Sequence, residues 1–193
     1  MLPFYNNVST LIPFSVDDLI DISCVEVLET VPSEDNFVHK QSLPPEVLTP
    51  QFLKFLNERD LEVSKVLIWT WLCKDPHIAH IDCNDKGEIL PSAFNFTMNT
   101  NKSDVRFYDM PDVDKTVMTG NQADTDWKTD NVEAYIPVNV KNIEPAAVWD
   151  DRGPCLINTS VPHLIVAPEI RTSISLQFTK AEPIEILLQK LSS

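Results

Sequence analysis

Apolar and polar residues alternate cleanly along two stretches of the chain, residues 94–99 and 171–178. Because successive side chains of a strand point to opposite faces, this period of two predicts two strands whose faces differ in polarity. Residues 65–73 are β-branched and aromatic, which predicts a buried strand. A further apolar run, residues 164–167, begins directly after His163. Strands therefore dominate the predicted fold.

Helical signals lie nearer the ends of the chain. Thr49 and Pro50 provide a cap and a proline at the first helical position, and apolar residues follow at 52, 53 and 56. Residues 183–191 carry an apolar stripe with helical spacing, which either packs on the strands or pairs two subunits of a homodimer. Around residues 15–22 the pattern fits a short helix or the start of a strand, and periodicity does not decide between them.

The segment from residue 109 to residue 130 is rich in Asp, Thr, Asn and Lys and has few apolar residues. It predicts a long loop, and loops of this length inside a domain are usually functional or disordered. Trp127 lies within this segment. It is a candidate for substrate contact, and the equal alternative is that it anchors the loop by packing.

Length and composition predict one soluble domain. The chain has 193 residues, of which 43% are hydrophobic, enough to bury a core of its own. We divide it into an N-terminal support of mixed structure (1–64), a β-barrel core (65–180) and a C-terminal helix (181–193). No apolar run is long enough to span a bilayer, and the first residues lack the basic start of a signal peptide. Four irregularly spaced cysteines favour free thiols and, with them, a cytoplasmic location.

The net charge of −14 argues against nucleic acid as a partner, because binding to a phosphate backbone needs a basic patch. Most of the imbalance lies at the front, where residues 1–64 hold eleven acidic and three basic residues. This first third is either an acidic face toward a basic partner or an ordinary solvated surface.

Three residues form a candidate metal site. His80 and Asp82 are two residues apart, so on a strand both point to the same side and can bind one ion. His163 supplies a second imidazole. Two histidines and one carboxylate on one face of an octahedral metal suit Fe(II) and leave positions open for substrate and dioxygen. Arg171 and Ser173 follow at short range and could bind a carboxylate, since a guanidinium offers a planar bidentate fork.

A zinc site is the rival interpretation, because Cys73, His77, His80 and Cys83 are spaced as C-x3-H-x2-H-x2-C. On an extended strand, however, His77 and Cys83 point to the side opposite to His80. His77 then supports the site through a hydrogen bond or lies in a turn.

The order of His80, Asp82, His163, Arg171 and Ser173 resembles that of the iron(II)/2-oxoglutarate-dependent dioxygenase superfamily. The resemblance covers roughly residues 64–178. It implies a mostly β fold, a double-stranded β-helix (a jelly-roll or cupin-like barrel) with flanking N-terminal helices. It also implies catalytic iron on the first three residues and 2-oxoglutarate held by Arg171 and Ser173.

In such an enzyme dioxygen and 2-oxoglutarate are consumed, succinate and carbon dioxide are released, and a C–H bond of the primary substrate is hydroxylated. The substrate is not identified by the sequence; a protein side chain and a small molecule both suit the scaffold. If Arg171 faces the barrel interior, the polar sides of the alternating strands face it too. Asn95 and Tyr108 then become candidates for contact with the cosubstrate, and Trp69 and Trp71 are either core residues or walls of the pocket.

Two other functions remain open. One is a non-enzymatic β-sandwich interaction module in which the histidines and the arginine coincide by chance. The other is a metal-dependent cupin isomerase or lyase, which uses similar ligands but has no need of Arg171.

Overall fold

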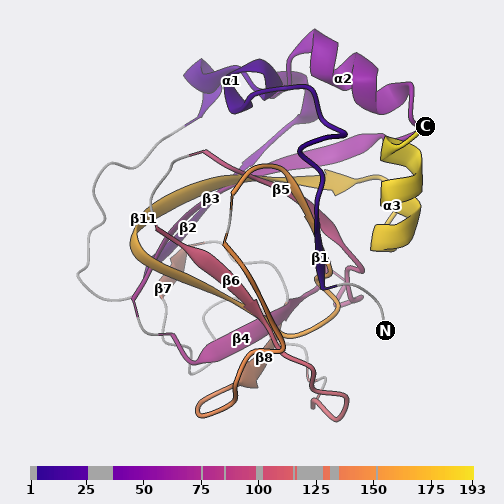
Figure 1. The fold of residues 1–193 in the computed structure, drawn as a ribbon. Helices are drawn as coiled ribbons and strands as arrows, with labels where there is room; N and C mark the ends of the chain where they lie inside the picture. The colour runs from indigo at the N-terminus through magenta and orange to yellow at the C-terminus, as the bar shows by residue number, and fades with distance from the viewer. Residues whose placement is uncertain are drawn as a thin grey trace.

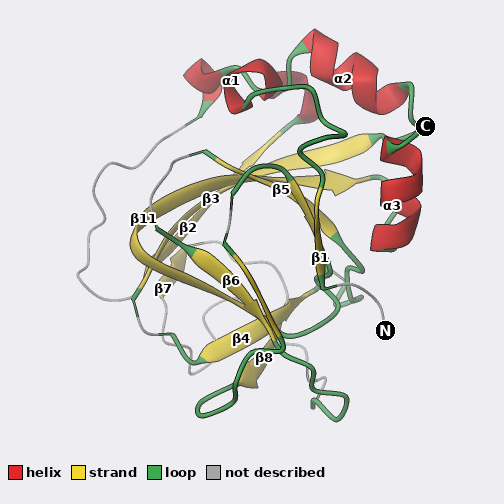
Figure 2. Cartoon of the chain, in the orientation of Figure 1, coloured by secondary structure: helices red, strands yellow, loops and turns green. Residues whose placement is uncertain are grey.

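Within the described residues the fold is built from strands, with three short α-helices packed against one side of them (Figures 1 and 2). It is seen in a computed structural model that describes residues 4–25, 37–74, 76–84, 86–98, 102–114, 116, 128–130, 135–150 and 152–193. The strands are β1 (Tyr5–Asn7), β2 (Phe37–Leu43), β3 (Val63–Cys73), β4 (Ile78–Asp82), β5 (Ala93–Thr97), β6 (Asp104–Phe107), β7 (Lys128–Asp130), β8 (Tyr135–Asn139), β9 (Ala147–Trp149), β10 (Cys155–Ile157) and β11 (His163–Phe178). The α-helices are α1 (Val16–Leu19), α2 (Pro50–Asn57) and α3 (Ile184–Leu191), and 3-10 turns occupy Ile22–Cys24 and Pro45–Val47.

Strand β11 joins the other strands into one 11-stranded, barrel-like sheet with two layers. The larger layer has the strand order β1-β10-β5-β11-β3-β2-β7, and the smaller layer has the order β8-β4-β11-β6-β9. The first residues of β11 pair with β4 and β6, whereas its later residues pair with β3 and β5. Every strand pair is antiparallel except that of β2 with β7.

The bend of β11 between the layers lies at an irregularity in its pairing with β3, where Ala167 pairs with Cys73 and Arg171 pairs with Trp71. Three residues of β11 thus stand opposite one residue of β3, an excess of two. Because side chains alternate with a period of two, an even excess leaves the odd-numbered residues of β11 on the same face before and after the bend. Figure 1 shows the strand curving round the left edge of the barrel.

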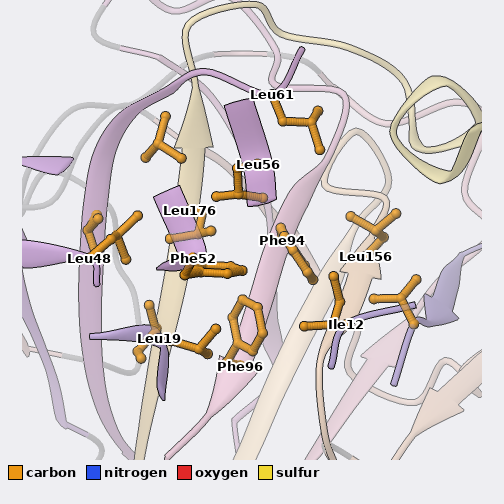
Figure 3. Packing of buried hydrophobic residues seen from close by; sticks show 14 of the residues in the cluster. Ile12, Leu19, Leu48, Phe52, Leu56, Leu61, Phe94, Phe96, Leu156 and Leu176 are labelled. Atoms are coloured by element: carbon orange, nitrogen blue, oxygen red, sulfur yellow. The ribbon is translucent and has the colours of Figure 1, made fainter. Parts of the chain in front are cut away.

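The outer face of the larger layer packs against the helices (Figure 3). The residues that meet in this contact all have buried apolar side chains. They include Leu19 from α1, Phe52 and Leu56 from α2, Ile184, Leu187 and Leu191 from α3, and Val66, Ile68, Phe94, Phe96, Ile174 and Leu176 from the strands. The rings of Phe52 and Phe96 meet edge to face, with centroids 5.9 Å apart. Burying each of these large side chains stabilises the fold by about 1.5–3 kcal/mol.

The structure confirms the elements that the sequence predicts most strongly. Helix α2 begins at Pro50, and the Thr49 side chain accepts a hydrogen bond from the Phe52 amide. Strand β3 covers the predicted buried strand, and α3 covers most of residues 183–191 and packs its apolar stripe on the strands. The fold is mostly β, as predicted. The undecided stretch near residue 15 forms the short helix α1.

Other parts differ from the predicted division of the chain. Residues 1–64 are not only a support, because they supply β1 and β2 to the larger layer. The predicted loop ends in strand β7. No disulfide joins the four cysteines, all of which lie in the described parts of the chain. None of the helices in those parts has the length and apolar character needed to cross a membrane.

Candidate metal centre and cavity

His80, Asp82 and His163 meet on the inner face of the smaller layer. His80 and Asp82 occupy alternate positions of β4, and His163, the first residue of β11, is the register partner of His80. Asp82 Oδ1 lies 3.4 Å from His80 Nε2 and 3.8 Å from His163 Nε2. Their ligand atoms all lie within 4.8 Å of one another, which is close enough for one metal ion. The two nitrogens and one oxygen form the donor set expected from the sequence.

The hydrogen bond of His163 fixes which ring nitrogen can bind a metal. Its Nδ1 lies 3.1 Å from the carbonyl oxygen of Val161. A carbonyl only accepts, so Nδ1 carries the proton and donates it, and Nε2 keeps its lone pair on the side of Asp82. The backbone just before β11 therefore prepares this imidazole as a ligand.

Burial prepares His80 in another way. Removal from water lowers the pKa of His80 well below the ordinary value of an imidazole, and the Coulomb interaction with the neighbouring His163 lowers it further. The neutral form is the one that binds a metal. Aromatic rings hold both imidazoles in place: the Trp71 ring lies nearly parallel to His80 at 6.1 Å, and that of Phe107 lies 6.2 Å from His163.

Arg171 and Ser173 lie on the inner face of the larger layer, with only 1% and 2% of their surfaces exposed. Arg171 Nη1 donates a hydrogen bond to Ser173 Oγ at 2.8 Å. Their register partners on β3 are Trp71 and Trp69, so these four side chains share one face. Since Trp71 also stacks on His80, the arginine lies in the same part of the barrel interior as the candidate metal ligand His80.

A cavity of about 250 Å³ begins at His80 and Asp82 and runs outward between the layers. His80, Asp82 and Trp71 line one part, and Ser64, Gln177 and Lys180 line another. Its remaining walls are formed by Leu67, Trp69, Cys83, Asn84, Leu90, Ser92, Ala93, Tyr135, Ser175, Phe178, Thr179, Ala181 and Glu182. Arg171 and Ser173 are not among the lining residues, although their partners Trp71 and Trp69 are.

The structure brings one of the two further cosubstrate candidates to this interior. Asn95 of β5 is the register partner of Ser175, a lining residue, so its side chain lies on the inner face. Tyr108 lies elsewhere. Phe107 is the register partner of His163, so the next residue points the other way, and Tyr108 is buried in a separate apolar cluster with Ile81 and Leu164.

Tyr135 is a cavity residue that the sequence does not single out. It is the first residue of β8 and the register partner of Asp82, and it is 4% exposed. Tyr135 reaches the cavity because it pairs with Asp82, which is 53 residues away in the sequence. The one local feature that indicates a strand here is the alternation of Tyr135, Ile136, Pro137 and Val138.

The zinc interpretation finds no support in the described parts of the chain. Within them, His80, Asp82 and His163 are the group of His, Cys, Asp or Glu side chains close enough to hold an ion, and Cys73, His77 and Cys83 do not belong to it. The backbone carbonyl of His77 accepts a hydrogen bond from the Val140 amide just before β4 begins. Trp127 lies outside the described residues.

Comparisons with known proteins assign no family. No family model and no curated protein matches the chain. One solved structure that resembles it is the X-ray structure of E. coli ycfD, at 15% sequence identity and a TM-score of 0.35 over 72% of this chain. The match covers 31% of the ycfD chain, so this chain spans about a third of that protein.

Proposed function

We propose that this chain is an Fe(II)- and 2-oxoglutarate-dependent oxygenase built on a double-stranded β-helix. The observation that carries the proposal is the combination of a two-histidine, one-carboxylate cluster with a buried arginine and serine on the facing layer of the same barrel. The cluster of two histidines and one carboxylate has many explanations when taken alone, and so does the buried pair of arginine and serine. Together they provide a site for a metal and a site for a distal carboxylate.

The strand order supports the jelly-roll part of the proposal. Going along the chain, β3 and β5 belong to the larger layer, and β4 and β6 to the smaller layer. The chain then adds β7 at the edge of the larger layer and β8 at the edge of the smaller layer, and it passes through β9 in the smaller layer and β10 in the larger layer before β11 contributes to both. Without β1, β2, β7 and β8, which lie toward the edges, and with β11 counted once in each layer, there are eight strands in two sheets, the number found in a jelly roll.

Each residue has a specific role in this proposal. His80, Asp82 and His163 would hold the iron, which when bound supplies the redox chemistry that activates dioxygen. Arg171 binds the distal carboxylate of 2-oxoglutarate through its fork, and Ser173 orients the guanidinium by accepting its hydrogen bond. The walls around His80 keep bulk water from the reacting atoms. Hydroxylation of a C–H bond, with release of succinate and carbon dioxide, is the proposed outcome.

The buried arginine also separates this proposal from its rivals. A cupin isomerase or lyase would use the metal cluster alone, and an interaction module would need neither part. A guanidinium that is 1% exposed on the inner face can meet a carboxylate in a site closed to water, where a charge-assisted hydrogen bond is strong. The proposed dicarboxylate cosubstrate makes use of this group.

The test is conversion of 2-oxoglutarate to succinate by the purified, Fe(II)-loaded protein, with calorimetric binding of 2-oxoglutarate measured in parallel. We expect binding and slow turnover in the wild type, and loss of turnover in Asp82→Ala. Asp150→Ala is the matched control, because Asp150 is an exposed aspartate paired with Arg152. Metal binding without any 2-oxoglutarate binding would favour the isomerase or lyase, and binding of neither would favour the interaction module.

A further inference from the structure

We infer that the outer part of the cavity receives the primary substrate through an uncharged, mostly apolar group. This inference rests on the proposed function and names the substrate class of the same site. Its basis is the separation of the barrel interior into a buried cationic region at Arg171 and an outer compartment whose charged groups are already paired.

The cavity and the buried region at Arg171 occupy different stretches of β11. Arg171 and Ser173 are almost completely buried and do not line the cavity. The cavity instead follows β11 past Ser175 to Gln177 and Lys180. An anionic cosubstrate needs a cation, so Arg171 draws it to the buried region. The space toward Gln177 is then left for the molecule that is oxidised.

The walls of this outer compartment are largely apolar. Leu67, Trp69, Ala93 and Phe178 contribute them from the larger layer, and Leu90 from the segment between β4 and β5. Hydroxyl and amide groups lie among these walls, on Ser64, Asn84, Ser92, Ser175 and Gln177. Apolar walls with a few neutral polar groups are typical of sites for small organic ligands, where burial supplies affinity and hydrogen bonds fix orientation.

The charged residues that line the cavity have oppositely charged neighbours. Glu182 lies 2.8 Å from Lys190 of α3, and Lys180 lies 3.6 Å from Asp60. Asp82 is the remaining charged residue of the described lining, and it belongs to the proposed metal site. A charged substrate group in this compartment would lose its hydration without gaining a new partner, which costs several kcal/mol. An uncharged group avoids that cost.

The segment that forms the outer wall, residues 178–182, is tied to its surroundings. Ser92 Oγ donates to the Glu182 carbonyl oxygen at 2.6 Å, and the Thr179 amide donates to the Glu62 carbonyl oxygen at 2.8 Å. Across the cavity, Trp69 and Tyr135 contribute rings from opposite layers. A cavity of about 250 Å³ with such walls suits one ring or one short aliphatic chain rather than a large molecule.

The experiment uses three probes of nearly equal size that differ in charge: benzyl alcohol, benzylammonium and benzoate. Each is titrated into the Mn(II)-loaded protein with 2-oxoglutarate present, and affinity and paramagnetic broadening of the probe signals are measured by NMR. We expect benzyl alcohol to bind at least tenfold more tightly than either ion, with broadening that places it near the metal. Equal or tighter binding of an ion would overturn the inference.

A matched pair of variants locates the binding. Ser64 and Ser42 are both exposed serines on neighbouring strands, β3 and β2, but Ser64 lines the cavity and Ser42 does not. Ser64→Trp should weaken benzyl alcohol binding at least tenfold, and Ser42→Trp should leave it unchanged. If Ser64→Trp leaves binding unchanged, the probe binds elsewhere and the assignment of this compartment fails.

Two further arms keep the outcomes distinct. Benzyl alcohol binding is also measured in the metal-free protein by tryptophan fluorescence. If the protein binds benzyl alcohol but never binds 2-oxoglutarate, the proposed function fails. The outer compartment is then not a substrate site, but its preference for a neutral group holds.

The capped amino acid N-acetylphenylalaninamide tests whether the neutral group belongs to a polypeptide or to a free small molecule. Affinity equal to that of benzyl alcohol indicates a polypeptide side chain, and tenfold weaker affinity indicates a free small molecule.

Discussion

The two faces of the larger layer are built from the same strands but differ in nearly every property. On the outer face, Phe94, Phe96, Ile174 and Leu176 belong to an apolar cluster that includes residues of the helices. The buried polar side chains of that face, Thr70 and Thr172, lie next to each other. On the inner face, the residues that alternate with them include Asn95, Ser173 and Ser175, and Arg171 lies further along β11. Adjacent residues of one strand therefore have different surroundings: one packs in the apolar cluster, and the next faces the candidate site.

This difference indicates which face the fold depends on. Apolar burial stabilises the outer face without need of partners, whereas burial of polar and charged groups on the inner face costs free energy unless each is hydrogen-bonded. A sequence selected for stability alone would fill the inner face with apolar residues as well. The polar inner face is therefore the part of the layer that function explains.

The largest effect is expected on the outer face. Phe94→Ala removes a fully buried ring that packs on Phe96 at a centroid distance of 4.5 Å. The free energy of unfolding, measured by urea denaturation, should fall by about 3–5 kcal/mol, as for other large-to-small core substitutions. Ile186→Ala, at a position 40% exposed on α3, is the control and should change it little. Loss of metal affinity in the folded Phe94→Ala protein would contradict the independence of the two faces.

The second effect concerns affinity rather than stability. Arg171→Lys keeps the positive charge but loses the planar fork, so 2-oxoglutarate affinity should fall by about 2–3 kcal/mol. Calorimetry with the metal-loaded protein measures it. Arg106→Lys provides the control, because Arg106 pairs with Asp104 on β6 away from the cavity lining. An unchanged affinity in Arg171→Lys would remove Arg171 from the cosubstrate site.

Local patterns made much of this comparison predictable. The alternation in residues 171–178 identified a strand with unlike faces, and the spacing of His80 and Asp82 put both on one side of a strand. The cap at Thr49 and the apolar stripe of α3 were equally local. Such features depend on residues within a few positions of one another, so the sequence alone contains them.

Features that depend on register were not predictable. Tyr108 and Phe107 are adjacent, and only the pairing of Phe107 with His163 shows that Tyr108 points away from the metal ligands. Tyr135 reaches the cavity because β8 pairs with β4 across a long separation in sequence. The two extra residues in β11, which keep His163 and Arg171 on one face, likewise have no signature in the local pattern. Long-range pairing decides each of these placements.

Between pH 8 and pH 5, acid should act on the inner face through His80. Because burial lowers the pKa of His80, the folded metal-free protein binds fewer protons at this residue than the unfolded chain does. Stability from this group is complete above the ordinary histidine pKa of about 6.5 and falls as pH decreases below it, by at most about 1.4 kcal/mol per pH unit. Urea denaturation between pH 8 and pH 5 measures the slope. His80→Gln should reduce it; an identical slope in the variant would show that His80 does not titrate in this way.

The smallest effect gives the sharpest comparison, because it uses two neighbouring residues of β11. Ser173 accepts a hydrogen bond from Arg171 at 2.8 Å on the inner face, whereas Thr172 faces the other way and lies 3.5 Å from the Thr70 hydroxyl. Ser173→Ala should weaken 2-oxoglutarate binding by about 1 kcal/mol, since it removes one hydrogen bond that orients the guanidinium. Thr172→Val removes a hydroxyl of similar burial and a hydrogen bond at the limit of its length, so cosubstrate affinity should stay at the wild-type value. If both variants lose the same 2-oxoglutarate affinity, the affinity depends on the general packing of β11. The two faces of the strand would then not differ in their role in cosubstrate binding.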